Sequence, residues 1–489
     1  MQTTAGANPG NTVIIKRLQA DHGLDGFHPY RPLNADMVRE VEKTVTEIFD
    51  RLGGVSLLKA DKAVYIKPNG VGQQPYAYTR PEVIEAAVRY WFHAGASQVF
   101  LFENSTQAAL TRLVFQMTGY ADLCRRTGAQ PIFLDEDETV PFEFMGKDPT
   151  SNDNPQGYDR TIFGMPRTVA EKLIQGKDRN LYVSIPKLKT HGMTVVTLGI
   201  KNQWGFAPHR HRIDDHNYNL HSKLVDVLSH LRPDVTLIDG VEGTIYGHYP
   251  PYALVNKCIR PFKVLIGGLN VAAVDIVGAR IFGFKIDDVP HLKLTMERGL
   301  GNGVASERDI TITGDYTDFD HLDILNEWAE FGGRYPNSLY PDFPDDVPII
   351  KGRDMACMDG CVSAALAGLQ LLALDNHGQG GWALVAGKGF NQDEIDSLPG
   401  PVLVAGTCAV DEVGDRLVSR LGKRKVYLTP GCCDITAITE ALCHVMKVNP
   451  MGLAPGLKPV KLADIIIRSK WNRSHGRQIN PLCGLIKMR

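Results

Sequence analysis

Apolar residues come in short β-rich runs that alternate with amphipathic stretches over much of the chain. AVYIKPN (63–69) has the pattern of a buried strand, and RPEVIEAAVRYWFHAG (80–95) that of a helix that begins near Pro81 and stops at Gly95. QVFLFEN (98–104) follows as the next strand. A strand–helix–strand rhythm is typical of a parallel sheet covered by helices. We therefore expect an α/β fold.

The same rhythm returns after a break. A polar segment rich in Pro, Asp and Tyr occupies 315–348, and beyond it GWALVAGKG, PVLVAGTC and KVYLTPGCC have the pattern of three more strands. A chain of 489 residues is too long for one ordinary core. The pattern predicts two domains, 1–330 and 350–489, each with a mainly parallel sheet flanked by helices.

Composition narrows the classes of partner. A formal net charge of −2 gives no general electrostatic reason to expect nucleic acid or an anionic membrane surface. The N-terminus has no basic segment followed by an apolar core, and the longest apolar stretch, VSAALAGLQLLAL, has 13 residues. Such a stretch is too short to span a bilayer. We expect a cytoplasmic protein with no nucleic-acid or membrane partner.

Cations gather in KLKTHGMTVVTLGIKN, where a plain core strand would not need them. The strand before it leads to the carboxyl edge of the sheet, where open α/β sheets place ligand crevices. We expect KLKTHG to form a turn. A lysine flanked by apolar residues, such as Lys189 or Lys201, loses its proton or binds an anion. The alternative is that Lys187 and Lys189 extend their charges to solvent while His191 caps a turn.

This segment supplies the candidate site of the first domain, which would bind a small anionic substrate. The expected catalytic residues are His191, Lys201 and His216, with an imidazole as general acid or base because it titrates near neutral pH. The expected substrate- or cofactor-binding residues are Lys67, Asn69, Lys189, Asn202 and Asp239. Asp239 ends an apolar strand, where an aspartate binds a ribose or metal, orients a histidine, or caps a turn. The run HRHRIDDHNYNLH (209–221) also fits a solvated polar loop.

Cysteines are concentrated in the second domain. Three predicted strands end in glycine turns, so Cys408 and Cys432 emerge on one edge if those strands are parallel neighbours. Cys361 falls in the first turn of the next predicted helix, with Cys357 one turn earlier. Four thiolates suit an iron–sulfur cluster or zinc, and Cys433 is an alternative to Cys432. The other interpretation is that these cysteines fill tight packing between the turns.

Five motifs keep their order over about residues 60–290: VYIKPN, RPEVIEAAVRYWFHAGASQVFLFEN, IPKLKTHGMTVVTLGIKNQWG, HLRPDVTLIDGVEG and VAAVDIVGARIFG. Together they resemble the family known as domain of unknown function 362. The resemblance implies an association with iron–sulfur modules, and thus a 4Fe-4S cluster. The chain departs from the family after DGVEG, where TIYGHYPP stands in place of a Gly-Pro pair.

A second resemblance concerns spacing alone. The distances in sequence between His191, Lys201 and His216 are similar to those of functional residues in the lactate racemase family, which carries a nickel-pincer nucleotide. The resemblance implies racemisation or epimerisation through that cofactor. The chain departs from this family at VVTLGI, where a glycine-rich stretch is usual.

Taken together, these patterns predict a metal-dependent oxidoreductase with an iron–sulfur cluster. It would act on a small anionic substrate held between the domains and exchange electrons with a redox partner protein. The alternatives are a nickel-pincer racemase or epimerase, a zinc protein, and a non-catalytic carrier or maturation protein for a cluster or metal.

Overall fold

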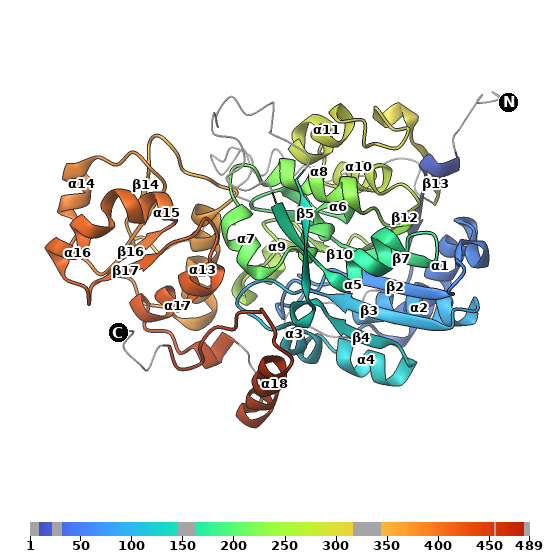
Figure 1. The fold of residues 1–489 in the computed structure, drawn as a ribbon, viewed down its shortest axis with the longest axis horizontal. Helices are drawn as coiled ribbons and strands as arrows, with labels where there is room; N and C mark the ends of the chain where they lie inside the picture. Colours follow the sequence, from blue (N-terminus) through green and yellow to red (C-terminus); the bar gives the residue numbers. More distant parts are fainter. Residues whose placement is uncertain (1–8, 22–31, 145–161, 316–343, 454–455, 484–489) are drawn as a thin grey trace.

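The computed structural model describes residues 9–21, 32–144, 162–315, 344–453 and 456–483. Two α/β parts lie side by side (Figure 1). The N-terminal part, drawn from blue to yellow, ends at Gly314 of its last strand, and the C-terminal part, drawn in orange and red, begins with the strand at Ile349.

The N-terminal part is built on an 11-stranded sheet whose main path has eight strands. In spatial order these are β13 (Thr311–Gly314), β1 (Thr12–Arg17), β12 (Val264–Gly268), β10 (Val235–Thr244), β7 (Asn180–Ile185), β2 (Ala63–Pro68), β3 (Gln98–Glu103) and β4 (Gln130–Phe133). The pairs from β10 to β4 are parallel, as is β1 with β13, whereas β12 is antiparallel to both its neighbours. The predicted α/β class with a mainly parallel sheet is confirmed.

Helices cover both faces of this sheet because the strands bury side chains in both directions. On one face, Val64 and Ile66 of β2 pack in a cluster with residues of α1 (Ala35–Arg51) and α2 (Pro81–His93). On the other face, Tyr65 belongs to a cluster with α8 (Leu220–His230) and α10 (Val271–Ile281). Strands buried on both faces are typical of parallel sheets. The expected helix at 80–95 is α2.

The expected turn at KLKTHG is wrong. Lys187–His191 form a fully buried strand, β8, which pairs in parallel with β10 and in antiparallel with β9 (Val195–Thr197). β10 has ten residues and extends past β7, so it offers hydrogen-bonding partners to the chain beyond Pro186. Because buried backbone groups need such partners, the segment continues as a strand.

The C-terminal part has a parallel four-stranded sheet, as expected. Its order is β14 (Ile349–Lys351), β15 (Ala383–Ala386), β16 (Val402–Ala405) and β17 (Val426–Thr429). On one face of this sheet, residues of α13 (Cys361–Asn376) and α17 (Ile435–Val445) belong to the largest apolar cluster. On the other face, α14 (Gln392–Ser397) and α16 (Asp415–Leu421) pack against Val385, Val402 and Val404.

The two parts share apolar packing. The largest apolar cluster includes residues of both sheets, and α18 (Pro459–Trp471) returns to the N-terminal part, where Leu462 and Ile465 pack with Leu110 and Leu113. The predicted domain boundary falls largely on 316–343, outside the described residues, so the limits at 330 and 350 stay a prediction. Among the described helices, none has the length and apolarity needed to cross a bilayer.

Candidate functional site

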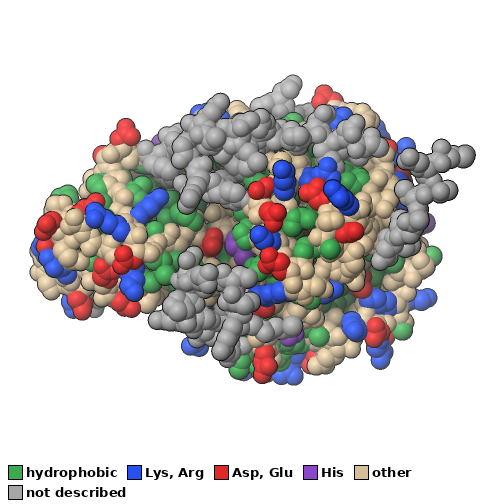
Figure 2. All heavy atoms as spheres, turned by 90° about the horizontal axis from the view of Figure 1, so that it is seen from above, with side chains coloured by type: hydrophobic (Ala, Val, Ile, Leu, Met, Phe, Trp, Pro, Cys, Tyr) green, Lys and Arg blue, Asp and Glu red, His purple; other side chains and the backbone are tan. Residues whose placement is uncertain are grey.

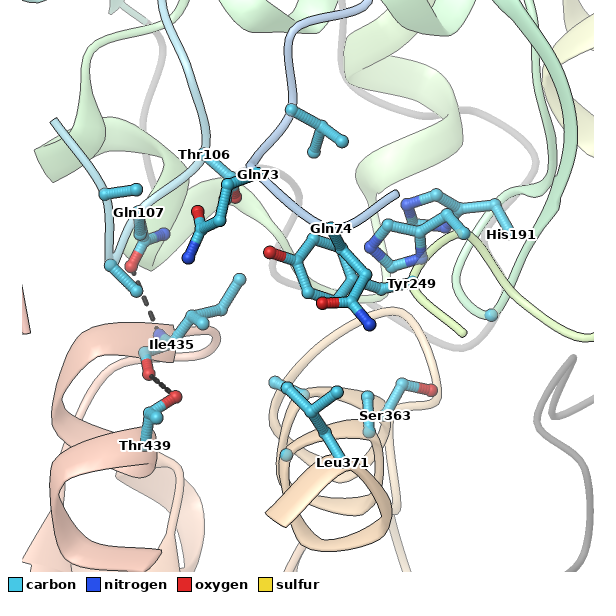
Figure 3. A pocket seen from close by; sticks show the side chains of 18 of the residues that line it. Gln73, Gln74, Thr106, Gln107, His191, Tyr249, Ser363, Leu371, Ile435 and Thr439 are labelled. Atoms are coloured by element: carbon cyan, nitrogen blue, oxygen red, sulfur yellow. Dashed lines mark hydrogen bonds between the residues drawn. The ribbon is translucent and has the colours of Figure 1, made fainter. Parts of the chain in front are cut away.

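A cavity of about 880 Å³ lies between the N-terminal part and helices α13 and α17. Seen from above, histidine side chains are visible at the junction of the two parts (Figure 2). In close-up, His191 lies on one side, Gln73, Gln74 and Tyr249 lie in the middle, and the two helices form the floor (Figure 3). The size falls in the range of small-molecule sites.

Lys201 lies on the short helix α6 (Gly199–Asn202) and lines the cavity. The Asp275 carboxylate fixes this helix by accepting hydrogen bonds from the backbone N–H groups of Gly199 and Ile200, each at 2.7 Å. Within the described residues, no hydrogen bond or ion pair involves the Lys201 ammonium group. Burial, and next the charge of Arg212, lower the pKa of Lys201 to about 7. Lys201 is therefore poised to bind an anion or to accept a proton.

Lys67 and Glu103 form a buried ion pair on the same wall. The Lys67 ammonium lies 2.6 Å from the Glu103 carboxylate, which also accepts from the backbone N–H groups of Gly70 at 2.7 Å and Asn104 at 2.8 Å. Burial lowers the pKa of Lys67, and the Glu103 charge opposes this. The Lys67–Glu103 pair has no net charge, so it forms part of the cavity wall without attracting an anion by its charge.

Asn69 and Asn202 line the cavity and are held by a chain of hydrogen bonds. Lys189 donates to Asn69 Oδ1 at 2.7 Å, Asn69 donates to Asn202 Oδ1 at 3.2 Å, and Asn202 donates to Ser184 Oγ at 3.0 Å. Lys189 itself lies behind the lining residues, where burial and the nearby Lys201 hold its pKa well below the usual range. It supports the two amides from the protein side.

The predicted histidines face the cavity in different tautomers. His191 Nδ1 accepts from the Met193 N–H at 3.0 Å, which leaves the proton of a neutral ring on Nε2. His216 Nδ1 lies 2.9 Å from the Asp359 carbonyl oxygen and must donate to it, which leaves Nε2 unprotonated. Burial, and next Lys201, lower the pKa of His216 to about 3, and burial holds that of His191 well below its usual range. Near neutral pH, His216 Nε2 is thus an acceptor and His191 Nε2 a donor.

A third histidine was not predicted. His248 lines the cavity, and its ring centroid lies 3.9 Å from that of His191, while the His191 and His216 centroids are 6.4 Å apart. His248 lies in TIYGHYPP, the stretch that departs from the family pattern. The departure from the family pattern at TIYGHYPP was therefore a sequence signal that could have indicated the role of His248.

The run 209–221 is mostly not a solvated loop. It forms helix α7 (His209–Asp215) and leads into α8, and Arg212 and His216 are buried against the cavity. Arg212 donates to the Ser105 carbonyl oxygen at 2.8 Å, and burial lowers its pKa to about 10.

Asp239 lies outside the cavity, in a cluster of fully buried charges. Lys187 contacts Asp239 at 3.0 Å and Glu242 at 2.8 Å, and Arg80 contacts Glu242 at 2.8 Å. Asp239 also accepts from the Arg80 backbone N–H at 2.8 Å. Of the residues expected from sequence, the cavity includes Lys67, Asn69, His191, Lys201, Asn202 and His216, and not Lys189 or Asp239.

The four predicted cysteines gather at the carboxyl edge of the second sheet. Cys361 begins α13, Cys408 follows β16, and Cys432 follows β17. Burial raises the pKa of Cys357 to about 12, and the nearby thiols of Cys361, Cys432 and Cys408 add to this increase. Cys408 is exposed, Cys357 and Cys432 are half-buried, and Cys361 is buried.

A glycine allows the turn after β16 to lie close to the Cys361 side chain. Gly406 has φ +96°, and a Cβ atom added there would lie 2.7 Å from Cys361 Sγ. Backbone N–H groups at the start of α13 donate toward the Cys361 sulfur and lower its pKa, although burial, the larger effect, raises it to about 12. In the described part of the chain, no three His, Cys, Asp or Glu side chains are close enough to hold a single metal ion.

The cysteine group adjoins the cavity wall. His216 bonds to the Asp359 carbonyl, two residues before Cys361, and Asn217 Nδ2 makes a weak contact of 4.0 Å with Cys432 Sγ. The Cys433 N–H donates to the Ile213 carbonyl oxygen at 2.8 Å. The edge that carries the cysteines therefore faces the histidine side of the cavity.

The fold and the cavity define a class: an α/β protein with two sheets, a ligand-sized cavity between them, and cysteines beside it. Residues 64–280 match the family model described as Domain of unknown function (DUF362). The resemblance expected over about 60–290 is confirmed. The chain is also 26% identical, over 275 residues, to the "Thylakoid-associated protein sll1697" of Synechocystis sp. (strain ATCC 27184 / PCC 6803 / Kazusa). The match covers 53% of this chain and 75% of that protein.

Proposed function

We propose that this protein is a cytoplasmic redox enzyme that binds an anionic substrate in the cavity and holds an iron–sulfur cluster on Cys357, Cys361, Cys408 and Cys432. One observation carries the proposal. His216 lines the cavity and bonds to the peptide that leads into Cys361, so substrate and cluster would lie on opposite sides of one short segment.

The four thiol groups are a donor set that suits an iron–sulfur cluster. Four thiolates around one zinc ion need bonds of about 2.3 Å and therefore closely spaced sulfurs. In a four-iron cluster each iron takes one thiolate, so the ligands stand further apart around a larger body. The four cysteines lie at one sheet edge and influence one another electrostatically. This grouping is what supports a cluster.

The residues of the cavity have separate tasks. Lys201, when protonated, and Arg212 attract the anionic group of the substrate, since neither forms an ion pair with a carboxylate within the described residues. His216 Nε2 accepts a hydrogen bond from the substrate, and His191 Nε2 donates one to it. The bound cluster would supply or accept single electrons. Exposed Cys408 gives a redox partner protein a short path to that centre.

The test is anaerobic purification followed by iron, sulfide and absorbance analysis. Near-stoichiometric iron and sulfide are expected in the unaltered protein. Cys357→Ser and Cys408→Ser should each abolish the visible absorbance. The matched control is Cys124→Ser, because Cys124 is a buried cysteine of α4 (Tyr120–Thr127) and should not affect iron content. Protein that holds no iron when prepared without oxygen would refute the proposal.

One observation favours a second candidate, a nickel-pincer racemase or epimerase. His191, Lys201 and His216, the three residues that carry that resemblance, line the same cavity. Nickel content and the intact mass of the purified protein separate the two candidates. A nickel ion together with an added mass lost in Lys201→Ala would establish the racemase. A carrier or maturation role would instead appear as cluster transfer to an acceptor protein without substrate turnover.

A further inference from the structure

The cavity has two chemically different ends, and we propose that its ligand is an elongated amphiphilic anion. The acid group would lie at Lys201 and Arg212, and an apolar body would lie along α13. This deepens the proposed function in one respect, because it rests on the cavity being the substrate site. It differs from the small anion expected from the sequence.

The acid end is defined by donors without partners. The buried Nε–H of Arg212 and Nε1–H of Trp204 form no hydrogen bond within the described residues, and no partner is recorded for the Lys201 ammonium either. Buried polar groups are nearly always hydrogen-bonded, so such orphans in one cavity indicate a missing acceptor. Glu103 is not that acceptor, because Lys67 and two backbone N–H groups already occupy its oxygens.

The apolar end is a groove along one face of α13. Ala364, Ala367, Leu371 and Leu374 line the cavity at helical spacing, over about 15 Å of the helix axis. Three more aliphatic side chains also line the cavity, Ile435, Leu453 and Ile479. The helices α13 and α17 form this floor in Figure 3. A small anion would leave the groove filled with water, whereas an apolar body would remove its surface from water.

The direction of the ligand follows from the ends of α13. The helix begins at Cys361, beside His216 and the acid end of the cavity. At its other end Asp375 accepts from the backbone N–H groups of Tyr252 at 2.8 Å and Ala253 at 3.0 Å. The acid group thus lies at the N-terminal end of the helix, whose dipole also favours negative charge. The apolar body would extend toward Tyr252.

Calorimetric titration with acetate, hexanoate and decanoate tests the groove, and decanol serves as the probe without an acid group. Each fully buried methylene should tighten the Kd by about fourfold. Decanoate should bind at least about tenfold more tightly than decanol, since an ion-paired contact is worth more than a neutral one. Equal affinity for acetate and decanoate would overturn the groove, and equal affinity for decanol and decanoate would overturn the acid end.

Variants locate the two ends. Ala367→Trp should fill the groove and remove the chain-length dependence while acetate still binds. Leu371→Ser is a second groove variant, for the case that the tryptophan disturbs the fold, and it should also weaken the binding of decanoate. Lys201→Met should weaken decanoate and leave decanol unchanged. The matched control is Lys470→Met, since Lys470 is an exposed lysine on α18. Unchanged chain-length dependence in both groove variants would overturn the proposal.

Iron and sulfide are measured in the same samples, so the two proposals can fail separately. Chain-length dependence in a protein without iron would support the groove and refute the iron–sulfur function. Iron without chain-length dependence would refute the groove alone.

Discussion

Two groups of buried charge in the N-terminal part differ in how they are compensated. In the paired cluster, Lys187 and Arg80 meet Asp239 and Glu242, and all the side chains are fully buried. At the cavity, Lys201 and Arg212 face open space. Lys187 and Lys201 lie only 14 residues apart in the sequence, so local sequence does not distinguish these two lysines.

The difference shows how burial can serve structure or binding. Removing one partner of a buried ion pair leaves an uncompensated charge and is strongly destabilising. Lys201 is half-buried and has no ionic partner among the described residues, and its pKa is lowered instead. An anion that enters the cavity would give the Lys201 ammonium an ionic partner. We therefore assign Lys187 to stability and Lys201 to binding.

The largest effect on stability is expected at the paired cluster. Glu242→Ala should lower the free energy of unfolding by about 3–5 kcal/mol, because Lys187 and Arg80 both lose a carboxylate partner. Urea unfolding measures this. Lys201→Met, the matched change at the cavity, should alter the free energy of unfolding by less than about 1 kcal/mol, as is usual away from buried networks. Equal losses in the two variants would break the comparison.

The next effect separates function from stability. Lys201→Ala and His191→Ala should abolish turnover or cofactor retention while the melting temperature stays within a few degrees of the unaltered protein. Neither side chain carries an ion pair among the described residues, and both face the cavity. Thermal unfolding and bound-metal analysis on the same samples check this. If the variants unfold early, Lys201 belongs with the paired cluster.

The smallest effect is a pH dependence of anion binding. The ligand meets Lys201 as a cation only below its pKa of about 7, so affinity should be highest below pH 7 and fall by up to about tenfold per pH unit above it. Arg212, Cys433, Lys67 and Glu103 act electrostatically on Lys201. Lys201 in turn lowers the pKa of the nearby titratable groups Lys189, His191, His216, His221, His248 and His291.

Calorimetry with decanoate between pH 6 and about 9 measures this dependence, since RT ln Kd follows the protonated fraction of Lys201. Lys201→Met should give a flat profile over the same range, and Lys470→Met should keep the slope. A slope that survives in Lys201→Met would assign the titration to another group.

Much of the architecture was predictable because it depends on local pattern. The alternation of apolar runs and amphipathic helices predicted a helix at 80–95, which is α2 (Pro81–His93), and three of the four strands of the second sheet, β15, β16 and β17. Glycine turns after these strands predicted that Cys408 and Cys432 emerge at one edge, because parallel neighbours end on the same side. The prediction of a turn at 187–191 was wrong because the ladder with β10 is a contact between distant segments.

Pattern along the chain is enough to predict the fold class, the sheet edge that carries the cysteines, and a cation-rich segment beside a crevice. These features follow from the periodicity of single helices and strands and from the turns that end neighbouring parallel strands. Which lysine is paired depends on the tertiary fold. Lys187 meets Glu242, 55 residues away, whereas Lys201 meets the cavity. It also brought His248 and the apolar face of α13 to the same cavity, because both depend on how segments far apart in the chain pack together.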